Sequence, residues 1–262
     1  MRSVQQLFDL HGQTALVTGG SSGLGWQIAQ ALGEAGARLV LSSRKADELA
    51  QGVARLRAQG IDAHGIAADC AQEEQLHRLG AAALAHLGHI DILVNNAGAA
   101  WGAPAESHTT EAWDKVMNLN VRGYFLLSQW VARECMIPRH AGSIINVASI
   151  AGLGGNPSEM KAIAYNTSKG AVINFTRALA AEWGVHGIRV NAICPGFFPS
   201  KMTQGTLAHL GEARLVAQAP LRRLGDDEDL KGLALLYASA AGKHITGQWL
   251  AVDGGVSVVL GG

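Results

Sequence analysis

The fold of this 262-residue chain is decided by the stretch Thr14-Ala15-Leu16-Val17-Thr18-Gly19-Gly20-Ser21-Ser22-Gly23-Leu24-Gly25. Its first five residues form a short apolar, β-branched run that is typical of a buried strand, and a glycine-rich turn follows directly. Apolar residues at helical spacing begin at Leu24. A strand, a tight glycine turn and a helix N-terminus form a site for pyrophosphate, because free backbone N–H groups and the helix dipole face the anion.

Strands and helices alternate along the rest of the chain. Predicted strands cover residues 14–18, 38–42, 63–67, 90–95, 143–147, 188–193 and 249–252. Predicted helices cover residues 24–35, 46–59, 73–86, 110–136, 162–183 and 227–239. The strands are apolar throughout instead of alternating, which is typical of a parallel sheet covered by helices on both faces. We therefore predict one α/β domain, with a further short helix in the long connection 197–223.

Composition argues against several classes of protein. Hydrophobic residues make up 48% of the chain, and 21 basic residues balance 21 acidic ones. No basic stripe indicates a nucleic-acid partner, and no apolar run is long enough for a signal peptide or a membrane span. We expect a cytoplasmic protein without nucleic-acid or membrane partners. The 3 cysteines are widely spaced and the 10 histidines follow no ligand pattern, so we expect neither a disulfide nor a metal.

The glycine turn predicts the phosphate end of a dinucleotide site. Gly19, Gly23 and Gly25 permit positive φ and a close approach of the backbone, while Ser21 and Ser22 add hydroxyl donors. The spacing Gly-x-x-x-Gly-x-Gly differs from the more general Gly-x-Gly-x-x-Gly fingerprint. The turn alone is therefore weak support for a dinucleotide.

The end of the second strand predicts which dinucleotide is bound. A site for NAD usually has Asp or Glu here to hold the ribose hydroxyls, whereas this chain has Ser43, Arg44 and Lys45. A guanidinium suits a 2′-phosphate, so we predict that Ser43 and Arg44 favour NADP(H) over NAD(H). The alternative is that Arg44 and Lys45 only begin a helix. Asp69, after the third strand, is predicted either to accept from the adenine amino group or to serve as a turn or helix cap.

Tyr165 and Lys169 predict proton chemistry beside this site. They are four residues apart in a predicted helix, so their side chains share one face. The pKa of a free tyrosine is about 10, and a close cation lowers such a value by roughly one to three units. A phenol with a pKa near working pH gives a proton to a carbonyl or takes one from an alcohol. The alternative is a pair of polar residues on an exposed helix face.

Several separate motifs then occur in one order along the chain. They are residues 18–25, Asn95-Asn96-Ala97-Gly98, Asn120, Ser149, residues 165–169 and Pro195-Gly196. With these residues the chain resembles the short-chain dehydrogenase/reductase (SDR) family. The resemblance implies a single-domain Rossmann fold over residues 1–262, with a seven-stranded parallel sheet and helices on both faces. It divides the chain into a cofactor-binding half, about 12–148, and a catalytic and substrate part, about 149–262, and it implies a homotetramer or a homodimer.

The same resemblance implies roles for single residues. Tyr165 is the expected general acid/base, and Lys169 is expected to lower its pKa and to bind the nicotinamide ribose. Ser149 is expected to hydrogen-bond the substrate oxygen, and Asn120 to anchor a water of a proton relay. Further cofactor contacts are implied for Leu24, Cys70, Asn96, Ala97, Gly98, Pro195, Gly196, Phe198 and Ser200.

The sequence defines the substrate less closely than it defines the cofactor. An apolar set of candidates suits a carbonyl on an alkyl or acyl group: Trp101, Ile150, Leu153, Met160, Phe197 and Met202. Ser149 and Tyr165 are sixteen residues apart, more than the family commonly shows, so residues 156–160 are expected to bulge beside the pocket. The two ends of the chain look like gluconate 5-dehydrogenases, whereas the segments after Gly98 and Pro195 are similar to 3-oxoacyl-thioester reductases.

We therefore predict an NADP(H)-dependent oxidoreductase that interconverts a ketone and a secondary alcohol of the 3-oxoacyl-thioester or keto-acid and sugar-acid type. Two alternatives stay open. One is an NAD(H)-dependent alcohol or polyol dehydrogenase of the same family. The other is a cofactor-binding regulator without turnover, because a fold does not fix a function.

Overall fold

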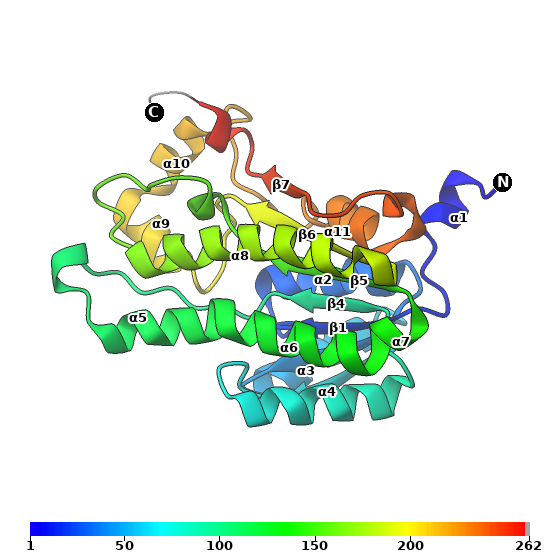
Figure 1. The fold of residues 1–262 in the computed structure, drawn as a ribbon. Coiled ribbons are helices and arrows are strands. Elements are labelled where there is room, and N and C mark those ends of the chain that lie inside the picture. Colours follow the sequence, from blue (N-terminus) through cyan, green and yellow to red (C-terminus); the bar gives the residue numbers. More distant parts are fainter. Residues whose placement is uncertain (260–262) are drawn as a thin grey trace.

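Seven parallel strands form one continuous sheet in the computed structural model, which describes residues 1–259, with only the backbone of residues 206, 208 and 209 (Figure 1). The strands are β1 (Thr14–Thr18), β2 (Arg38–Ser43), β3 (Ala63–Ala67), β4 (Ile92–Asn95), β5 (Gly142–Val147), β6 (Ile188–Pro195) and β7 (Trp249–Val252). Their order across the sheet is β3-β2-β1-β4-β5-β6-β7. The predicted parallel α/β sheet is confirmed, with ends shifted by one to two residues at several strands.

Helices cover both faces of this sheet (Figure 1). They are α1 (Val4–Phe8), α2 (Gly23–Glu34), α3 (Ala46–Arg57), α4 (Glu73–Leu87), α5 (Thr110–Met117), α6 (Gly123–Val131), α7 (Ile137–Arg139), α8 (Ile163–Trp183), α9 (Gln204–Leu210), α10 (Glu212–Gln218) and α11 (Lys231–Ala238). Buried side chains of α2, α3 and α11 join one core, and those of α4, α6 and α8 join the other. The short helix expected in 197–223 is present as two, α9 and α10.

The burial of β1 explains why its sequence does not alternate. Ala15 and Val17 belong to the core under α2 and α3, whereas Leu16 belongs to the opposite core. All three side chains are fully buried. Burying a Val or Leu side chain stabilises a fold by roughly 1.5 to 3 kcal/mol, so both faces of the strand select apolar residues. Because all the strands are parallel, their carboxyl ends meet at one edge, where the predicted functional residues gather.

The predicted single helix over residues 110–136 is wrong in detail. The chain keeps one helical line through α5 and α6 (Figure 1), but π-helical segments interrupt it at Asn118–Arg122 and Ala132–Met136. The first segment contains Asn120, whose buried side chain bonds Ala99 and Ser168. These long-range bonds compensate for the local change of hydrogen-bond pattern, and π segments often occur at functional sites.

The helices, the cysteines and the longest connection beside the sheet also bear on the sequence predictions. Across residues 1–259, no helix combines the length and the apolar character needed to cross a bilayer. Cys70, Cys135 and Cys194 are buried free thiols that pack in the hydrophobic cores. The long connection between β6 and α9 lies at the carboxyl edge of the sheet, where it borders the functional cavity.

Candidate active site

The glycine turn after β1 leaves backbone donors facing open space. Gly19 and Gly23 have φ values of +64° and +57°, in the region that favours glycine. Ser22 caps α2, but its side chain makes no capping hydrogen bond. A side chain at Gly25 would collide with the Asn96 amide, so this glycine allows the helix to pack close to β4. The first N–H groups of α2 therefore have no side-chain acceptor at the cap and suit an anion.

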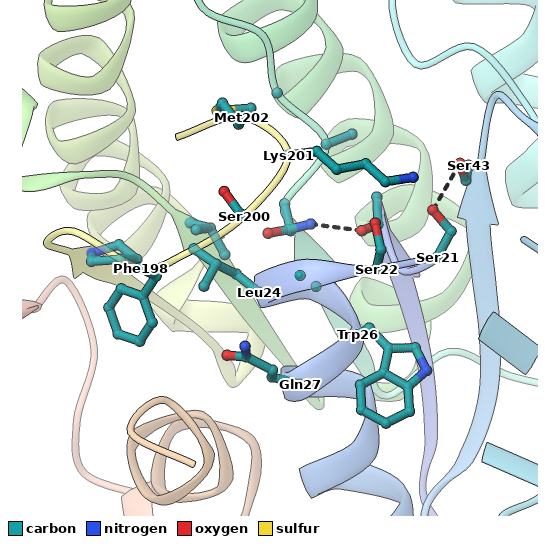
Figure 2. Close-up of a pocket in the computed structure, with 18 of the residues that line it drawn as sticks. Ser21, Ser22, Leu24, Trp26, Gln27, Ser43, Phe198, Ser200, Lys201 and Met202 are labelled. Carbon is teal, nitrogen blue, oxygen red and sulfur yellow. Dashed lines mark hydrogen bonds between the residues drawn. The ribbon is translucent and has the colours of Figure 1, made fainter. Parts of the chain in front are cut away.

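One cavity of about 560 Å³ joins this turn to the ends of β4, β5 and β6. Figure 2 shows part of it, with Leu24 and Trp26 below the loop that carries Ser200. The predicted cofactor residues that line it are Gly19, Ser21, Ser22, Gly23, Leu24, Gly25, Ser43, Arg44, Cys70, Asn96, Ala97, Gly98, Tyr165, Lys169, Pro195, Gly196, Phe198 and Ser200. Residues separated by up to about 180 positions thus face one space.

Lys169 lies at the far end of this cavity from Arg44. Its side chain is buried, with 3% exposed, and its Nζ donates to the Val147 carbonyl oxygen at 2.7 Å. The ammonium lies 5.7 Å from the centre of the Tyr165 ring and 5.5 Å from that of Tyr124. Burial lowers the pKa of Lys169 to about 8, because the charged form loses hydration.

Tyr165 and Ser149 line the cavity beside Lys169. Burial raises the pKa of the Tyr165 phenol, while the neighbouring Ser149 hydroxyl acts in the opposite direction. The loss of hydration is the largest influence on the phenol, so its pKa lies above the ordinary value and not below it as the sequence predicts; that Lys169 itself favours the phenolate stays a prediction. The Lys169 ammonium is held by the end of β5.

Asn120 lies behind the cavity lining and is fully buried. Its Oδ1 accepts from the Ala99 N–H at 2.8 Å, and its Nδ2 donates to the Ala99 carbonyl at 2.9 Å and to Ser168 Oγ at 2.9 Å. Ser168 precedes Lys169 in α8. Asn120 thus ties α8 to the chain that follows β4, and its predicted role in a proton relay stays a prediction.

The opposite end of the cavity has the predicted ribose residues. Ser21 Oγ donates to Ser43 Oγ at 3.2 Å (Figure 2), and Arg44 lies beside them in the lining. Asp69 is absent from that lining. Its carboxylate accepts from the Ala71 N–H at 3.0 Å, which is the turn role that the sequence left open. The adenine contact of Asp69 stays a prediction.

The lining also contains residues that the sequence did not single out. Trp26 and Gln27 lie one turn after Gly23 in α2, so helical spacing alone could have found them. The Arg55 guanidinium lies 4.2 Å from the Trp26 ring centre, and Gln27 Nε2 donates to Asp227 Oδ1 at 2.7 Å. The others are Glu48, Ala68, Leu119, Val147, Ala148, Pro199, Lys201 and Thr203, together with Lys45, for which the sequence left a helix start as the alternative. Each of them lies within about four positions of a predicted site residue, so proximity in the sequence could have indicated them.

Of the predicted substrate residues, Met202 lines the cavity. Trp101, Ile150, Leu153, Met160 and Phe197 lie outside that lining, and their role stays a prediction. The chain around Trp101 lies next to the predicted bulge, because the Ala103 N–H donates to the Lys161 carbonyl at 2.8 Å. Glu159 of this bulge forms an ion pair with Arg214 of α10. The segment around Trp101 and the bulge at residues 156–160 therefore lie outside the cavity lining.

The chain matches known proteins over nearly its whole length. The profile of the short chain dehydrogenase family matches residues 13–210. Gluconate 5-dehydrogenase of Gluconobacter oxydans (strain 621H) is 38% identical over 97% of this chain and 98% of its own. The rhamnolipid-biosynthesis 3-oxoacyl-(acyl-carrier-protein) reductase of Pseudomonas aeruginosa is 40% identical over 95% of this chain and 97% of its own.

A solved structure supports the same family. A gluconate 5-dehydrogenase from Burkholderia cenocepacia J2315, in complex with NADP and tartrate, superposes with a TM-score of 0.92 at 34% identity, covering 98% of this chain and 100% of the other. The resemblance stated from the motifs is thereby confirmed. The chain belongs to the short-chain dehydrogenase/reductase family and is an oxidoreductase that acts on CH–OH and C=O groups.

Proposed function

We propose that the protein is an NADP(H)-dependent reductase or dehydrogenase that interconverts a ketone and a secondary alcohol, with Tyr165 as its acid/base. One observation carries the proposal. A single cavity is lined at one end by the glycine turn and Arg44, and at the other end by Ser149, Tyr165 and Lys169. An extended dinucleotide fits this arrangement, because its phosphates need the first end and its reacting ring needs the second.

The residues present fit a dinucleotide. A side chain at Gly23 would meet nothing closer than Ser200 Cβ at 3.9 Å, so the backbone of the turn is open to the cavity. The lining contains the cations Arg44, Lys45, Arg55, Lys169 and Lys201 against the carboxylates Glu48 and Asp227. A surplus of positive charge in a partly enclosed space favours a polyanion.

Arg44 supports NADP(H) over NAD(H). It lies at the end of β2 beside Ser43, where a carboxylate would instead hold two free ribose hydroxyls. A guanidinium forms charge-assisted, often bidentate bonds with a phosphate. NADP is named with the Burkholderia structure and with the Pseudomonas aeruginosa RhlG/NADP active-site complex, which is 39% identical to this chain, with a TM-score of 0.89 and coverage of 96% of this chain and 99% of that one. NAD(H) is the alternative.

The chain's own residues then supply orientation and a proton. When bound, the nicotinamide supplies or accepts the hydride. Because burial raises the pKa of Tyr165, the phenol stays protonated at neutral pH and can donate its Oη proton to a carbonyl oxygen. Ser149 Oγ donates a hydrogen bond to the same oxygen as negative charge develops there. With a pKa of about 8, Lys169 is mostly cationic at neutral pH and stabilises the phenolate that remains.

Two substrate classes are supported by the relatives. One curated relative is named for gluconate and another for a 3-oxoacyl thioester, at nearly equal identity. Both are pairs of a carbonyl and a secondary alcohol, so the proposed proton transfer serves either. The substrate classes differ in what the ketone carries, which is an alkyl chain and a thioester in one and a polyhydroxy carboxylate chain in the other.

The test is the rate of NADPH oxidation by the purified protein with acetoacetyl-CoA and with 5-ketogluconate, in parallel assays. Turnover of one compound alone assigns the substrate class. Tyr165→Phe is the control, and we expect its rate to fall by about 10²- to 10⁴-fold while NADPH still binds. Near-normal turnover by this variant would contradict the acid/base role. NADPH binding without turnover of any ketone or alcohol would favour the regulator instead.

We also propose the homotetramer that the resemblance implies. Exposed apolar side chains support it, because Phe125 of α6 is 42% exposed and Leu250 of the edge strand β7 is 52% exposed. Exposed apolar surface on long helices and on an open sheet edge is typical of contacts between copies. Light scattering coupled to size-exclusion chromatography measures the mass directly, and a monomer would contradict this proposal.

A further inference from the structure

Lys201 links two sides of the cavity lining, the β6–α9 connection and the first turn of α3. It belongs to the connection between β6 and α9, next to Ser200, and therefore starts on the side of the cavity formed by the end of β6. Its Nζ lies 3.1 Å from Glu48 Oε1, in the first turn of α3 on the opposite side. In Figure 2 the side chain extends from its loop across the glycine turn toward Ser21 and Ser43. A cation from one side thus lies at the predicted ribose end.

Glu48 is an unexpected neighbour for a phosphate site. Its Oε1 also lies 3.0 Å from Lys45 Nζ, so two ammonium groups share one carboxylate oxygen beside Arg44. The Lys201 side chain is 72% exposed, and an exposed ion pair of this kind is weak. Releasing Lys201 from Glu48 is therefore easy, and a phosphate dianion is a stronger partner than a carboxylate shared between two cations.

The base of the loop holds Lys201 in reach. Phe198 is buried, and the Gly225 N–H donates to the Phe197 carbonyl at 2.9 Å. The Ser200 N–H donates to Thr203 Oγ1 at 2.9 Å, which closes a turn around Lys201. The loop is therefore fixed on both sides of an exposed, flexible lysine, so only the side chain has to move to change partner.

We propose that Lys201 is a ligand of the ribose 2′-phosphate, and that it exchanges Glu48 for this phosphate when NADP(H) binds. This inference rests on the proposed NADP(H) function. It assigns phosphate recognition to a residue of the β6–α9 loop as well as to Arg44 at the end of β2. Because Ser200 is adjacent to Lys201, a bound 2′-phosphate then also holds the β6–α9 loop, which borders the reacting end of the cavity.

The test uses two small ligands that differ only in the 2′-phosphate. They are adenosine 2′,5′-bisphosphate and adenosine 5′-monophosphate, titrated by calorimetry into the wild type and the variants. Neither ligand contains nicotinamide, so the measurement is independent of activity. For Lys201→Met we expect the affinity for the bisphosphate to fall about fivefold, with less than about a twofold change for the monophosphate, since the site is partly exposed. Lys201→Arg, which keeps the charge, should restore most of the loss.

Two further variants test whether the affinity for the bisphosphate follows the charge at the ribose end of the cavity. Glu48→Gln removes a negative charge from the ribose end, so the affinity for the bisphosphate should rise about threefold. Lys243→Met changes an exposed lysine outside the cavity lining and should leave both affinities unchanged. Raising the salt concentration should shrink the effects of Lys201→Met and Glu48→Gln together.

The outcomes separate the two proposals. If the wild type binds both ligands equally, the proposed preference for NADP(H) fails, and the role of Lys201 fails with it. If the wild type prefers the bisphosphate but Lys201→Met keeps that preference, only the role of Lys201 is refuted. Equal losses for both ligands would assign Lys201 to the 5′-phosphate and overturn its assignment to the 2′-phosphate.

Discussion

Lys169 should make the stability of this protein rise with pH in the mildly alkaline range. Its ammonium is buried at the end of the cavity, where it has one hydrogen bond, to the Val147 carbonyl. Burial lowers its pKa from 10.5 to about 8. Below about pH 8 both the folded and the unfolded chain hold this proton. Between 8 and 10.5 the folded chain releases it while the unfolded chain keeps it, so the free energy of unfolding increases with pH.

The size of the effect follows from the two pKa values. Each unit of difference corresponds to about 1.4 kcal/mol, so the full shift corresponds to roughly 3 kcal/mol. Over the accessible interval from about pH 7.5 to about pH 9.5 the expected gain is about 2 kcal/mol, because most of the remainder develops only above about pH 9.5. Lys169→Met has no proton to release at this position and lacks the gain.

The assay is urea unfolding of wild type and Lys169→Met at a series of pH values and one protein concentration, because assembly would otherwise shift the apparent stability. The quantity to plot is the difference between the two free energies of unfolding. Titrating groups remote from Lys169 are present in both proteins and cancel in this difference, whereas Tyr165 and Cys194 lie beside Lys169, so the pH series ends at about pH 9.5, before these two groups titrate. A difference that stays constant with pH would refute the reasoning, since it would mean that Lys169 has an ordinary pKa in the folded protein.

Other substitutions test separate parts of the site. Arg44→Asp should reverse the preference for NADPH over NADH by removing a phosphate ligand and adding a ribose ligand, which the ratio of the two dissociation constants measures. Gly25→Ala should abolish dinucleotide binding and lower the melting temperature, because the new methyl group collides with Asn96. Gly232→Ala, in a helix with open space around it, should instead raise stability by up to about 1 kcal/mol. Asn120→Ala should lower the free energy of unfolding by about 3 kcal/mol, roughly 1 kcal/mol for each of its three hydrogen bonds, as measured by urea unfolding.

Much of the fold follows from local pattern. Leu16 and its neighbours in β1 are buried from both sides, and a run of that kind already indicates a central parallel strand. The interruption of the helix around Asn120 was not predictable in this way. Its cause is a set of hydrogen bonds to Ala99 and Ser168, which are distant in sequence, whereas helical periodicity reports only nearest turns. The division of the chain near residue 148 stays a prediction, since the cavity draws on both parts.

The candidate site shows the same contrast between local patterns, which the sequence reveals, and contacts between distant residues, which it does not. Tyr165 and Lys169 were found because four-residue spacing on a helix fixes their relation before any tertiary contact forms. The pKa of Tyr165 was predicted in the wrong direction, because its hydration depends on everything that packs around it. Lys201 and Glu48 were missed because their pairing joins a loop to the first turn of α3, about 150 residues apart in the sequence. Contacts of this kind have no signature in a single sequence.

The conflict between the two substrate resemblances has a structural explanation in the way the cavity is built. Tyr165 and Lys169 lie on α8 against the end of β5, where packing against the sheet leaves little freedom for the chemistry to change. The predicted surroundings of the substrate include instead the loop of residues 156–160, whose Glu159 forms an ion pair with Arg214 of α10. Loops tolerate exchange far better than strand ends do. We therefore expect the relatives named for a sugar acid and for an acyl thioester, which are 38% and 40% identical to this chain, to share its proton machinery and to differ from it in the loops.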